Sequence, residues 1–384
     1  MKVLIVHNNY GKYSGEEAVV DKMASMFLEM GHEVCFYRQT SEGYRDSLSG
    51  KINGFLCGLY SRNGVKGMRE VLQREKPDVV NVHNLYPFIS PAALFECKRA
   101  GVPVVMTVHN FRLICPTGLF MRNGRPCEYC LERGNEWGCI LHNCEHSILK
   151  SIGYAARNAV ARWTRAYMDC VDRFACITDF QRQKLVAAGY GVGRMVVIPN
   201  SVDVPQEIET AVGTYIAYIG RLSYEKGYDL LIEVAQRHPE ITFRFAGAQR
   251  GEASTNYPSN VEFAGYLKGE KLKEFIKGSR FLIMPSRWYE GFPMVILEAA
   301  QHGKFVIGPN HGGFTEIIGT GAEAIGKLFE PGQVDDLEQK ITNLWTNPQE
   351  CIRLGLMAFD KLKRKYSSEV ALKQWMQLLE DVKR

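Results

Sequence analysis

The feature that most constrains the fold is a regular alternation of short apolar runs with helical segments. In the first half, the apolar runs at residues 2–6, 32–37, 78–82 and 102–108 predict strands, and the segments between them show helical patterns. Continuously apolar strands separated by helices are typical of a parallel sheet that is covered on both faces. The alternation therefore predicts an α/β fold.

The same alternation restarts in the second half of the chain. Residues 199–213 are polar, acidic and contain proline, so they are expected to form a linker. A chain of 384 residues is also long enough for two domains. We therefore predict two doubly wound units. The second has predicted strands at residues 214–219, 242–246, 261–263, 281–284 and 304–308, followed by a helical tail at 334–384.

The amino-terminal residues and the net charge bear on the cellular location and the partners of the protein. Only four apolar residues separate Lys2 from His7, too few for a secretory leader, and no apolar stretch approaches the ~20 residues that span a bilayer. The net charge of +5 is a weak hint of anionic partners. We expect a cytoplasmic protein with no nucleic-acid partner.

Residues 285–300, PSRWYEGFPMVILEAA, directly follow a predicted buried strand. Pro293 suits the first turn of a helix, whose free N–H groups and dipole favour an anion. Glu290 and Glu298 lie on either side of this helix start, and carboxylates so close to an anion are better suited to bind hydroxyl groups. An anion together with hydroxyls indicates a sugar nucleotide.

Two further loops of the second half follow predicted strands. Arg221 and Lys226 lie five residues apart after the strand at 214–219, a spacing suited to a diphosphate. Solvated loop charges are the alternative interpretation. The loop at 309–316 offers Gly312-Gly313 for a close backbone approach and Glu316 as an acceptor.

Together these motifs resemble the retaining GT-B glycosyltransferases of family four, also called glycosyltransferase group 1. The resemblance covers nearly the whole chain and implies two Rossmann-like domains that face each other across a cleft. It implies an N-terminal acceptor-side domain at 1–203, a nucleotide-sugar-binding domain at 204–367, and a last helix at 368–384 that crosses back to the first domain. The matching motifs are Gly220-Arg221 with Glu225-Lys226-Gly227, Glu290-Gly291-Phe292-Pro293 with Glu298-Ala299, Gly312-Gly313 with Glu316, Ser14-Gly15-Glu16-Glu17, and Pro199-Asn200-Ser201-Val202-Asp203.

The resemblance also implies a role for each matching residue. Arg221 and Lys226 are expected to bind the donor diphosphate, and Glu298 the ribose hydroxyls. Glu290 is expected to lie against the transferred sugar. The backbone of Phe292, Pro293, Met294 and Val295 is expected to meet the distal phosphate and sugar, Gly15 to approach the phosphates, and His109 to reach the sugar from the other domain. Ser14 stands where the family commonly has the first glycine of a Gly-Gly pair, so the resemblance does not establish a close approach of the backbone to the phosphates at that position.

The implied reaction transfers a sugar from a UDP- or GDP-sugar, with retention, to a glycan or lipid-linked acceptor in cell-surface polysaccharide synthesis. Arg221, Lys226 and the helix start would stabilise the leaving diphosphate, and no catalytic metal is expected. Glu290 is a tempting nucleophile, but the family is thought to react on one face with help from the leaving phosphate. The alternatives are a sugar-nucleotide epimerase of the same architecture and a non-catalytic, zinc-stabilised adaptor with a degenerate transferase core.

Five cysteines fall within residues 111–146, a segment that interrupts the alternation. The spacing of Cys127-Glu128-Tyr129-Cys130 with further cysteines nearby is typical of a structural zinc site. We favour Cys115, Cys127, Cys130 and Cys144 as ligands, with Cys139 in reserve and His142 or His146 as substitutes. Free thiols and an iron–sulfur cluster are the alternatives. A subset of the resembled family carries a comparable insert.

The helix predicted at 148–168 has an apolar face and a basic face. Its apolar residues are expected to pack in the core, and Lys150, Arg157 and Arg165 lie opposite them. The basic face is either solvated or in contact with anionic lipid headgroups on the inner face of the membrane. The apolar face carries Ile148, Leu149, Ile152, Ala156, Ala159, Trp163 and Tyr167.

Overall fold

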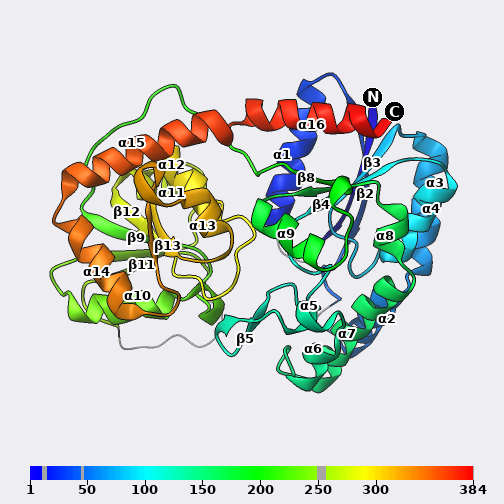
Figure 1. The fold of residues 1–384 in the computed structure, drawn as a ribbon, viewed down its shortest axis with the longest axis horizontal. Coiled ribbons are helices and arrows are strands. Elements are labelled where there is room, and N and C mark those ends of the chain that lie inside the picture. The colour runs from blue at the N-terminus through cyan, green and yellow to red at the C-terminus, as the bar shows by residue number, and fades with distance from the viewer. Residues whose placement is uncertain (11–14, 45–46, 249–256, 384) are drawn as a thin grey trace. The chain divides into compact units, whose positions relative to one another are not determined.

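The computed structural model describes residues 1–10, 15–44, 47–248 and 257–383 (Figure 1). The chain divides into two compact units. Unit 1 contains Met1–Phe120, Glu128–Pro199 and Ala371–Arg384, and unit 2 contains Met121–Cys127 and Asn200–Val370. Ser14, in the predicted glycine loop, lies outside the described residues.

Unit 1 is built on a six-stranded parallel sheet with the order β2-β1-β3-β4-β7-β8. The residues of β3 and β4 are all buried, as expected for central strands covered on both faces. The strands are β1 (Lys2–Asn9), β2 (Glu33–Thr40), β3 (Val79–Val82), β4 (Val104–Val108), β7 (Arg173–Cys176) and β8 (Met195–Val197).

Helices connect and cover these strands. The predicted helix at 148–168 is two helices, because Arg165 takes a left-handed conformation (φ 55°) that ends the first and starts the second. The helices of unit 1 are α1 (Gly15–Glu29), α2 (Leu48–Leu59), α3 (Arg62–Glu75), α4 (Leu94–Arg99), α5 (Tyr129–Arg133), α6 (Trp137–Leu141), α7 (Ile148–Trp163), α8 (Ala166–Cys170), α9 (Asp179–Ala187) and most of α16 (Ser368–Lys383).

The prediction for the apolar face of α7 is wrong. Its buried residues are Ser151, Gly153, Ala155, Asn158 and Ala161, which are small or polar. Small residues allow a close approach: a Cβ atom on Gly153 would lie 2.7 Å from the Phe55 ring of α2. The helix therefore packs through its small face, and Ile148, Leu149, Ile152 and Trp163 are exposed.

Unit 2 is a second six-stranded parallel sheet, with the order β11-β10-β9-β12-β13-β14. This is the strand order 3-2-1-4-5-6 of dinucleotide-binding folds. The predicted α/β fold of two Rossmann-like, doubly wound units is confirmed. The strands are β9 (Tyr215–Ile219), β10 (Phe243–Ala246), β11 (Val261–Gly265), β12 (Ser279–Ile283), β13 (Val306–Pro309) and β14 (Lys327–Phe329).

One helix of unit 2, α15, begins with a recognisable sequence signal. Before α15, the Asn347 side chain accepts a hydrogen bond from the Glu350 N–H, and Pro348 occupies the first turn. The unit also contains a short antiparallel hairpin of β5 (Met121–Arg122) and β6 (Arg125–Pro126). Its helices are α10 (Tyr228–Arg237), α11 (Glu270–Lys277), α12 (Val295–Ala300), α13 (Gly312–Ile318), α14 (Val334–Trp345) and α15 (Pro348–Lys365).

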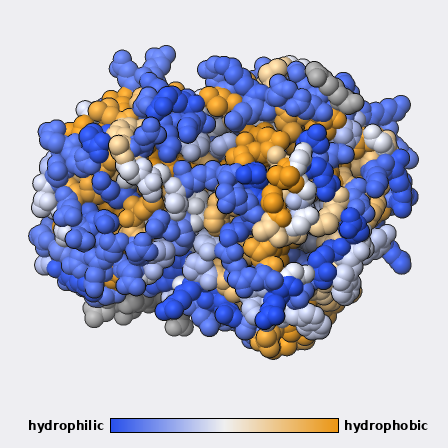
Figure 2. All heavy atoms as spheres, in the orientation of Figure 1, coloured by the Kyte–Doolittle hydropathy of each residue, from blue (hydrophilic) through white to orange (hydrophobic). Residues whose placement is uncertain are grey.

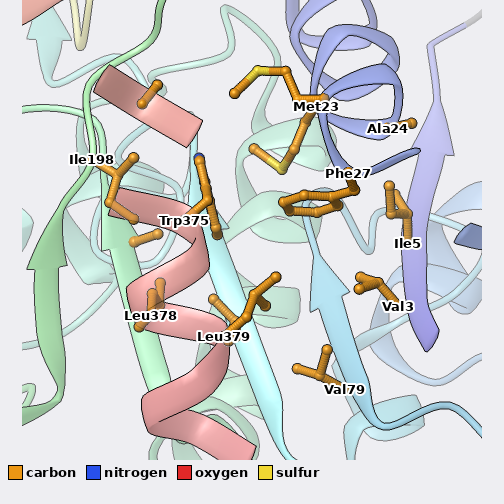
Figure 3. Packing of buried hydrophobic residues seen from close by; sticks show 14 of the residues in the cluster. Val3, Ile5, Met23, Ala24, Phe27, Val79, Ile198, Trp375, Leu378 and Leu379 are labelled. Atoms are coloured by element: carbon orange, nitrogen blue, oxygen red, sulfur yellow. The ribbon is translucent and has the colours of Figure 1, made fainter. Parts of the chain in front are cut away.

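The last helix, α16, is part of the core of unit 1 (Figure 3). Trp375 packs edge-on against Phe27 of α1, with ring centroids 5.8 Å apart. Leu378 and Leu379 lie in the same cluster as Val3 of β1. The C-terminal residues thus complete the face of the sheet that α1 begins to cover. Among the described helices, none combines the length and apolar character needed to cross a bilayer.

Candidate active site

The strand order of unit 2 points to one edge of its sheet. The chain leaves β9 to build β10 and β11 on one side and then returns to place β12 on the other, so the order reverses between β9 and β12. Ligands of such sheets bind beyond the carboxyl ends of the two strands at this reversal. Arg221 follows β9, and Glu290 follows β12.

Glu290 is the centre of a charged cluster at that edge. The Lys226 ammonium donates to Glu290 Oε1 over 2.6 Å, and the indole N–H of Trp288 donates to the same oxygen, also over 2.6 Å. The Ser286 hydroxyl adds a third hydrogen bond of 3.0 Å. Burial opposes ionisation of Glu290, but Lys226 and these donors outweigh it, so the pKa of its carboxyl is below the ordinary value. The carboxylate is therefore held ionised.

A glycine brings Lys226 to this cluster. Lys226 ends the short 3₁₀ turn η3 (Tyr224–Lys226), and Gly227 follows with φ 71°. A Cβ atom on Gly227 would lie 1.9 Å from the carbonyl oxygen of Pro285, so only glycine allows the turn to pack against the segment after β12. Lys226 and Glu290 meet because of this close backbone approach.

Arg221 and Glu298 flank the cluster in sequence. The Arg221 guanidinium is partly exposed, and it lies 3.5 Å from the carboxylate of Glu225. Tyr218 holds the loop by donating to the Arg221 carbonyl over 2.7 Å. Glu298 lies in α12, where burial raises the pKa of its carboxyl. The helix starts at Val295, two residues after Pro293, and has only six residues, so the side-chain cations carry most of the positive charge at this edge.

The third predicted loop packs directly on the Glu290 segment. Gly313 N–H donates to the Glu290 carbonyl over 2.8 Å, and a Cβ atom on Gly313 would lie 2.6 Å from the Gly291 carbonyl oxygen. His311, just before α13, contacts the Tyr289 ring edge-on. The two loops therefore support each other's backbone.

In unit 1, three histidines gather at the carboxyl ends of β1, β3 and β4. His83 Nδ1 lies 2.7 Å from His109 Nε2, and the two rings are stacked. His7 packs edge-on against His83. The strand order of unit 1 reverses between β1 and β3, so this cluster also lies where a ligand is expected.

The electrostatics of this cluster favour neutral imidazoles. Burial lowers the pKa of His7 and of His109 to about 4, and it lowers the pKa of His83 well below its ordinary value. Glu16, at the start of α1, lies 3.8 Å from His7, and burial raises the pKa of its carboxyl. At neutral pH the His109 imidazole is uncharged and able to donate or accept a hydrogen bond.

The structure brings together some predicted residues and adds others. Glu290, Lys226, Arg221 and Glu298 belong to unit 2, whereas His109 and Gly15 belong to unit 1. Phe292, Pro293, Met294 and Val295 follow the Glu290 segment and lead into α12, as the motif predicts.

Several residues of these sites were not predicted from the sequence. Trp288 and Ser286 lie within the motif of residues 285–300, but the spacing of its acids gave no reason to select them as donors to Glu290. In unit 1, Tyr10 donates to Glu16 over 3.0 Å. Arg112 lies 3.5 Å from the Tyr10 hydroxyl, and no local pattern marks either residue.

The predicted structural zinc site is not supported. In the parts of the chain that the structure describes, no group of three or more His, Cys, Asp or Glu side chains is arranged to hold a metal ion. Cys139, the predicted reserve ligand, is buried, and a hydrogen bond with Cys144 together with burial raises the pKa of its thiol, with smaller effects of Cys115 and Cys130. Cys127 belongs instead with unit 2.

The chain has sequence relatives that align over most of its length. One relative is a 42.6 kDa protein of Klebsiella pneumoniae encoded in a cps region, 27% identical, with 90% of this chain and 96% of that protein covered. Another is the sulfoquinovosyl transferase SQD2 of Arabidopsis thaliana, 31% identical, with 82% of this chain and 61% of that protein covered.

Among solved structures, Anabaena HepE in complex with UDP matches 99% of this chain and 100% of its own, with a TM-score of 0.66 and 17% identity. This likeness concerns the fold. Residues 206–359 match the family described as glycosyl transferases group 1, and residues 13–206 match glycosyltransferase family 4. The chain therefore belongs to the family-four glycosyltransferases, with the GT-B fold.

Proposed function

We propose that the protein is a retaining glycosyltransferase that moves a sugar from a nucleoside-diphosphate sugar to a glycan or lipid-linked acceptor. The observation that carries the proposal is the cluster of Lys226, Glu290 and Trp288 beside Arg221 at the strand-order reversal of unit 2. It combines cations for a diphosphate with an ionised acceptor for sugar hydroxyls. Solved neighbours of the same fold were obtained with UDP and with UDP-glucose, which makes a uridine donor the first to test.

Lys226 is suited to bind phosphate without releasing Glu290. An ammonium group has three donors, and the structure commits one of them to Glu290 Oε1. A phosphate of the nucleotide sugar would accept a hydrogen bond from another N–H of this ammonium group. The partly exposed Arg221 guanidinium would add a second cation. The leaving diphosphate would then be stabilised by charges that are already in place.

The remaining roles follow from the environment of each group. The raised pKa of Glu298 means that its carboxylate lacks stabilisation, which ribose hydroxyls would supply by donating to it. Glu290 would accept from hydroxyls of the transferred sugar. In unit 1, we propose that the neutral His109 contacts the sugar and that the backbone at Gly15 approaches the phosphates.

We propose retention without a covalent intermediate at Glu290. All three donors around this carboxylate converge on one oxygen, Oε1, and they stabilise its charge, which weakens it as a nucleophile. The leaving phosphate would accept the proton of the acceptor hydroxyl. A role in cell-surface polysaccharide synthesis is proposed from the cps-region relative.

The proposal is tested with a panel of nucleotide sugars. A true donor binds the native state and raises the melting temperature, and transfer or slow hydrolysis should release the matching nucleoside diphosphate. UDP- and GDP-sugars are the primary candidates, with UDP and GDP alone as controls. A panel in which no nucleotide sugar raises the melting temperature and none is turned over would refute the proposal.

A further inference from the structure

Three helices of unit 1 expose a group of large apolar side chains. Leu149 of α7 is 82% exposed, and Trp137 of α6 and Trp163 of α7 are each 71% exposed. Figure 2 shows hydrophobic side chains gathered over the region where Figure 1 places α6 and α7. We call this the apolar surface, and it comprises Ile52, Leu56, Trp137, Leu141, Leu149 and Trp163.

The contacts between the helices make this surface continuous. Phe55 of α2 packs on Gly153 of α7, which places α2 along one side of the exposed stripe. On the other side, the Cys139 thiol of α6 contacts the Ser151 carbonyl of α7 at 3.7 Å. The surface thus has the α7 stripe in its middle and one helix on each flank.

The two tryptophans lie next to one ion pair. Arg162 makes two hydrogen bonds of 3.0 Å to Glu136, and Trp163 and Trp137 are the residues that follow these two. The ion pair fixes the ends of α7 and α6 relative to each other. Indole rings prefer the boundary between hydrocarbon and water, because the ring is apolar while its N–H needs a polar partner.

The charge of the three helices favours an anionic occupant. Their sequences contain Lys51, Lys150, Arg157 and Arg162 and no Asp or Glu. Arg162 is neutralised by Glu136, and the Arg157 guanidinium donates to the Pro116 carbonyl. Lys51 and Lys150 are exposed, and each is next in the chain to a residue of the apolar surface, Ile52 and Leu149 respectively. The carboxylate of Glu145 is partly buried, and burial raises its pKa against the opposing effects of Arg157 and Lys150.

We infer that the apolar surface docks on the headgroup region of an anionic lipid bilayer. Exposed Leu, Ile and Trp side chains would enter the boundary between headgroups and acyl chains, while Lys51 and Lys150 would contact lipid phosphates. A second copy is a poorer occupant, because two-fold pairing would gather the lysines of both copies around one interface to which these three helices contribute no Asp or Glu. This inference does not depend on the proposed transfer reaction, because lipid binding needs no sugar donor.

Vesicle sedimentation tests the inference. The full chain is mixed with vesicles of phosphatidylcholine alone or of phosphatidylcholine with phosphatidylglycerol, with no nucleotide present. We expect binding to the anionic vesicles, and at least about tenfold weaker binding after Trp137→Ser, Leu149→Ser and Trp163→Ser are combined. Lys51→Gln with Lys150→Gln should weaken it about 25-fold, at about fivefold per lysine.

A matched control separates this surface from general hydrophobicity. Leu28→Ser, Tyr266→Ser and Leu356→Ser together remove three exposed apolar side chains from other elements, and this variant should bind like the unaltered protein. In the unaltered protein, brominated lipid should quench tryptophan fluorescence, a readout that needs no variant. The absence of anionic-vesicle binding, an equal loss in the control, or a dimer dispersed by the Trp137, Leu149 and Trp163 substitutions would overturn the inference.

Discussion

Lys226 and Glu290 are 64 positions apart in the chain, and their charged groups lie 2.6 Å apart at the edge of unit 2. Both side chains are largely shielded from water, with exposed fractions of 13% and 11%. An ion pair of this kind persists only when each charge has its partner and further hydrogen bonds. Trp288 and Ser286 supply these bonds to Glu290, so the site holds one positive and one negative group before any ligand binds.

Replacing Lys226 by methionine should therefore affect both binding and turnover. The variant loses one charge-assisted hydrogen bond to the diphosphate, which predicts roughly 10- to 100-fold weaker binding of UDP or GDP. The turnover number should fall by a further factor of about 100, because charge developing on the leaving group is no longer stabilised. Calorimetric titration and initial rates measure the two effects separately.

The control for this variant is Lys268→Met, which removes an exposed lysine of the same unit. It should leave nucleotide binding and turnover unchanged. If Lys226→Met bound the nucleoside diphosphate as tightly as the Lys268 control, Lys226 would have only a structural role.

Glu290→Gln distinguishes an electrostatic role from a nucleophilic one. Glutamine keeps an acceptor oxygen for Trp288 and Ser286 but removes the charge that Lys226 balances. We expect slow residual transfer, with a turnover number about 100-fold lower and the same anomer in the product. Rates and product anomers are read by NMR. Complete loss of transfer, with donor binding intact, would favour an essential carboxylate nucleophile.

The buried histidines of unit 1 predict a dependence of stability on pH. His109 has a native pKa of about 4, against an ordinary value of 6.5, because burial disfavours the imidazolium ion. Between these values the unfolded chain binds a proton that the native chain does not, so the free energy of unfolding should rise with pH over this window. His109→Gln should flatten the rise, as measured by urea unfolding at several pH values.

His238 offers a control of opposite sign. Burial lowers its pKa, but hydrogen bonds with Glu240 and Glu338 outweigh this effect and raise the pKa above 6.5. Its contribution to stability is fully present below 6.5 and is lost as the pH rises through the native pKa. His238→Gln should therefore alter the profile above pH 6.5 and leave the lower window unchanged. If the unaltered protein, His109→Gln and His238→Gln all showed the same dependence of the free energy of unfolding on pH, the pKa shifts assigned to His109 and His238 would both be contradicted.

Most strands of the two parallel sheets could be predicted from the sequence because they are short apolar runs with clear boundaries, whereas β14 was not predicted. The run at residues 2–6 became β1, and the reversal of strand order then explains why residues after β9 and β12 meet. The pairing of Glu290 with Trp288 could not be predicted. It depends on the turn made by the residues between β12 and α12, which has no periodic pattern.

The orientation of α7 shows a second limit of sequence reasoning. Periodicity identifies which side chains share a face, and Ile148, Ile152 and Trp163 do share one. It does not say which face meets the protein. That choice depends on Gly153 accepting the Phe55 ring, and Phe55 belongs to α2, a helix that was not predicted from the sequence.

The packing of α16 predicts a large effect of a substitution far from the candidate site. Trp375 is 3% exposed and contacts Phe27 in the core of unit 1. Trp375→Ala should lower the free energy of unfolding by about 3–5 kcal/mol, since it leaves a large cavity. The neighbouring Met376 is 39% exposed, and Met376→Ala should change it by no more than about 0.5 kcal/mol. Similar midpoints of urea denaturation for the two variants would contradict this account of the core.

Alanine substitutions at Gly227 and Gly265 form a matched pair that tests the close approach of Gly227 to the Pro285 backbone, the contact that positions Lys226. Both have positive φ, 71° and 70°, so alanine at either position costs about 1–2 kcal/mol in backbone strain. Only at Gly227 would the new Cβ collide with a backbone oxygen, that of Pro285 at 1.9 Å, whereas the space around Gly265 is open. Gly227→Ala should therefore be the less stable variant, and it should also weaken nucleoside diphosphate binding by displacing Lys226. Gly265→Ala should bind as the unaltered protein does. Equal melting temperatures and equal nucleotide affinities for the two variants would show that this contact does not position Lys226.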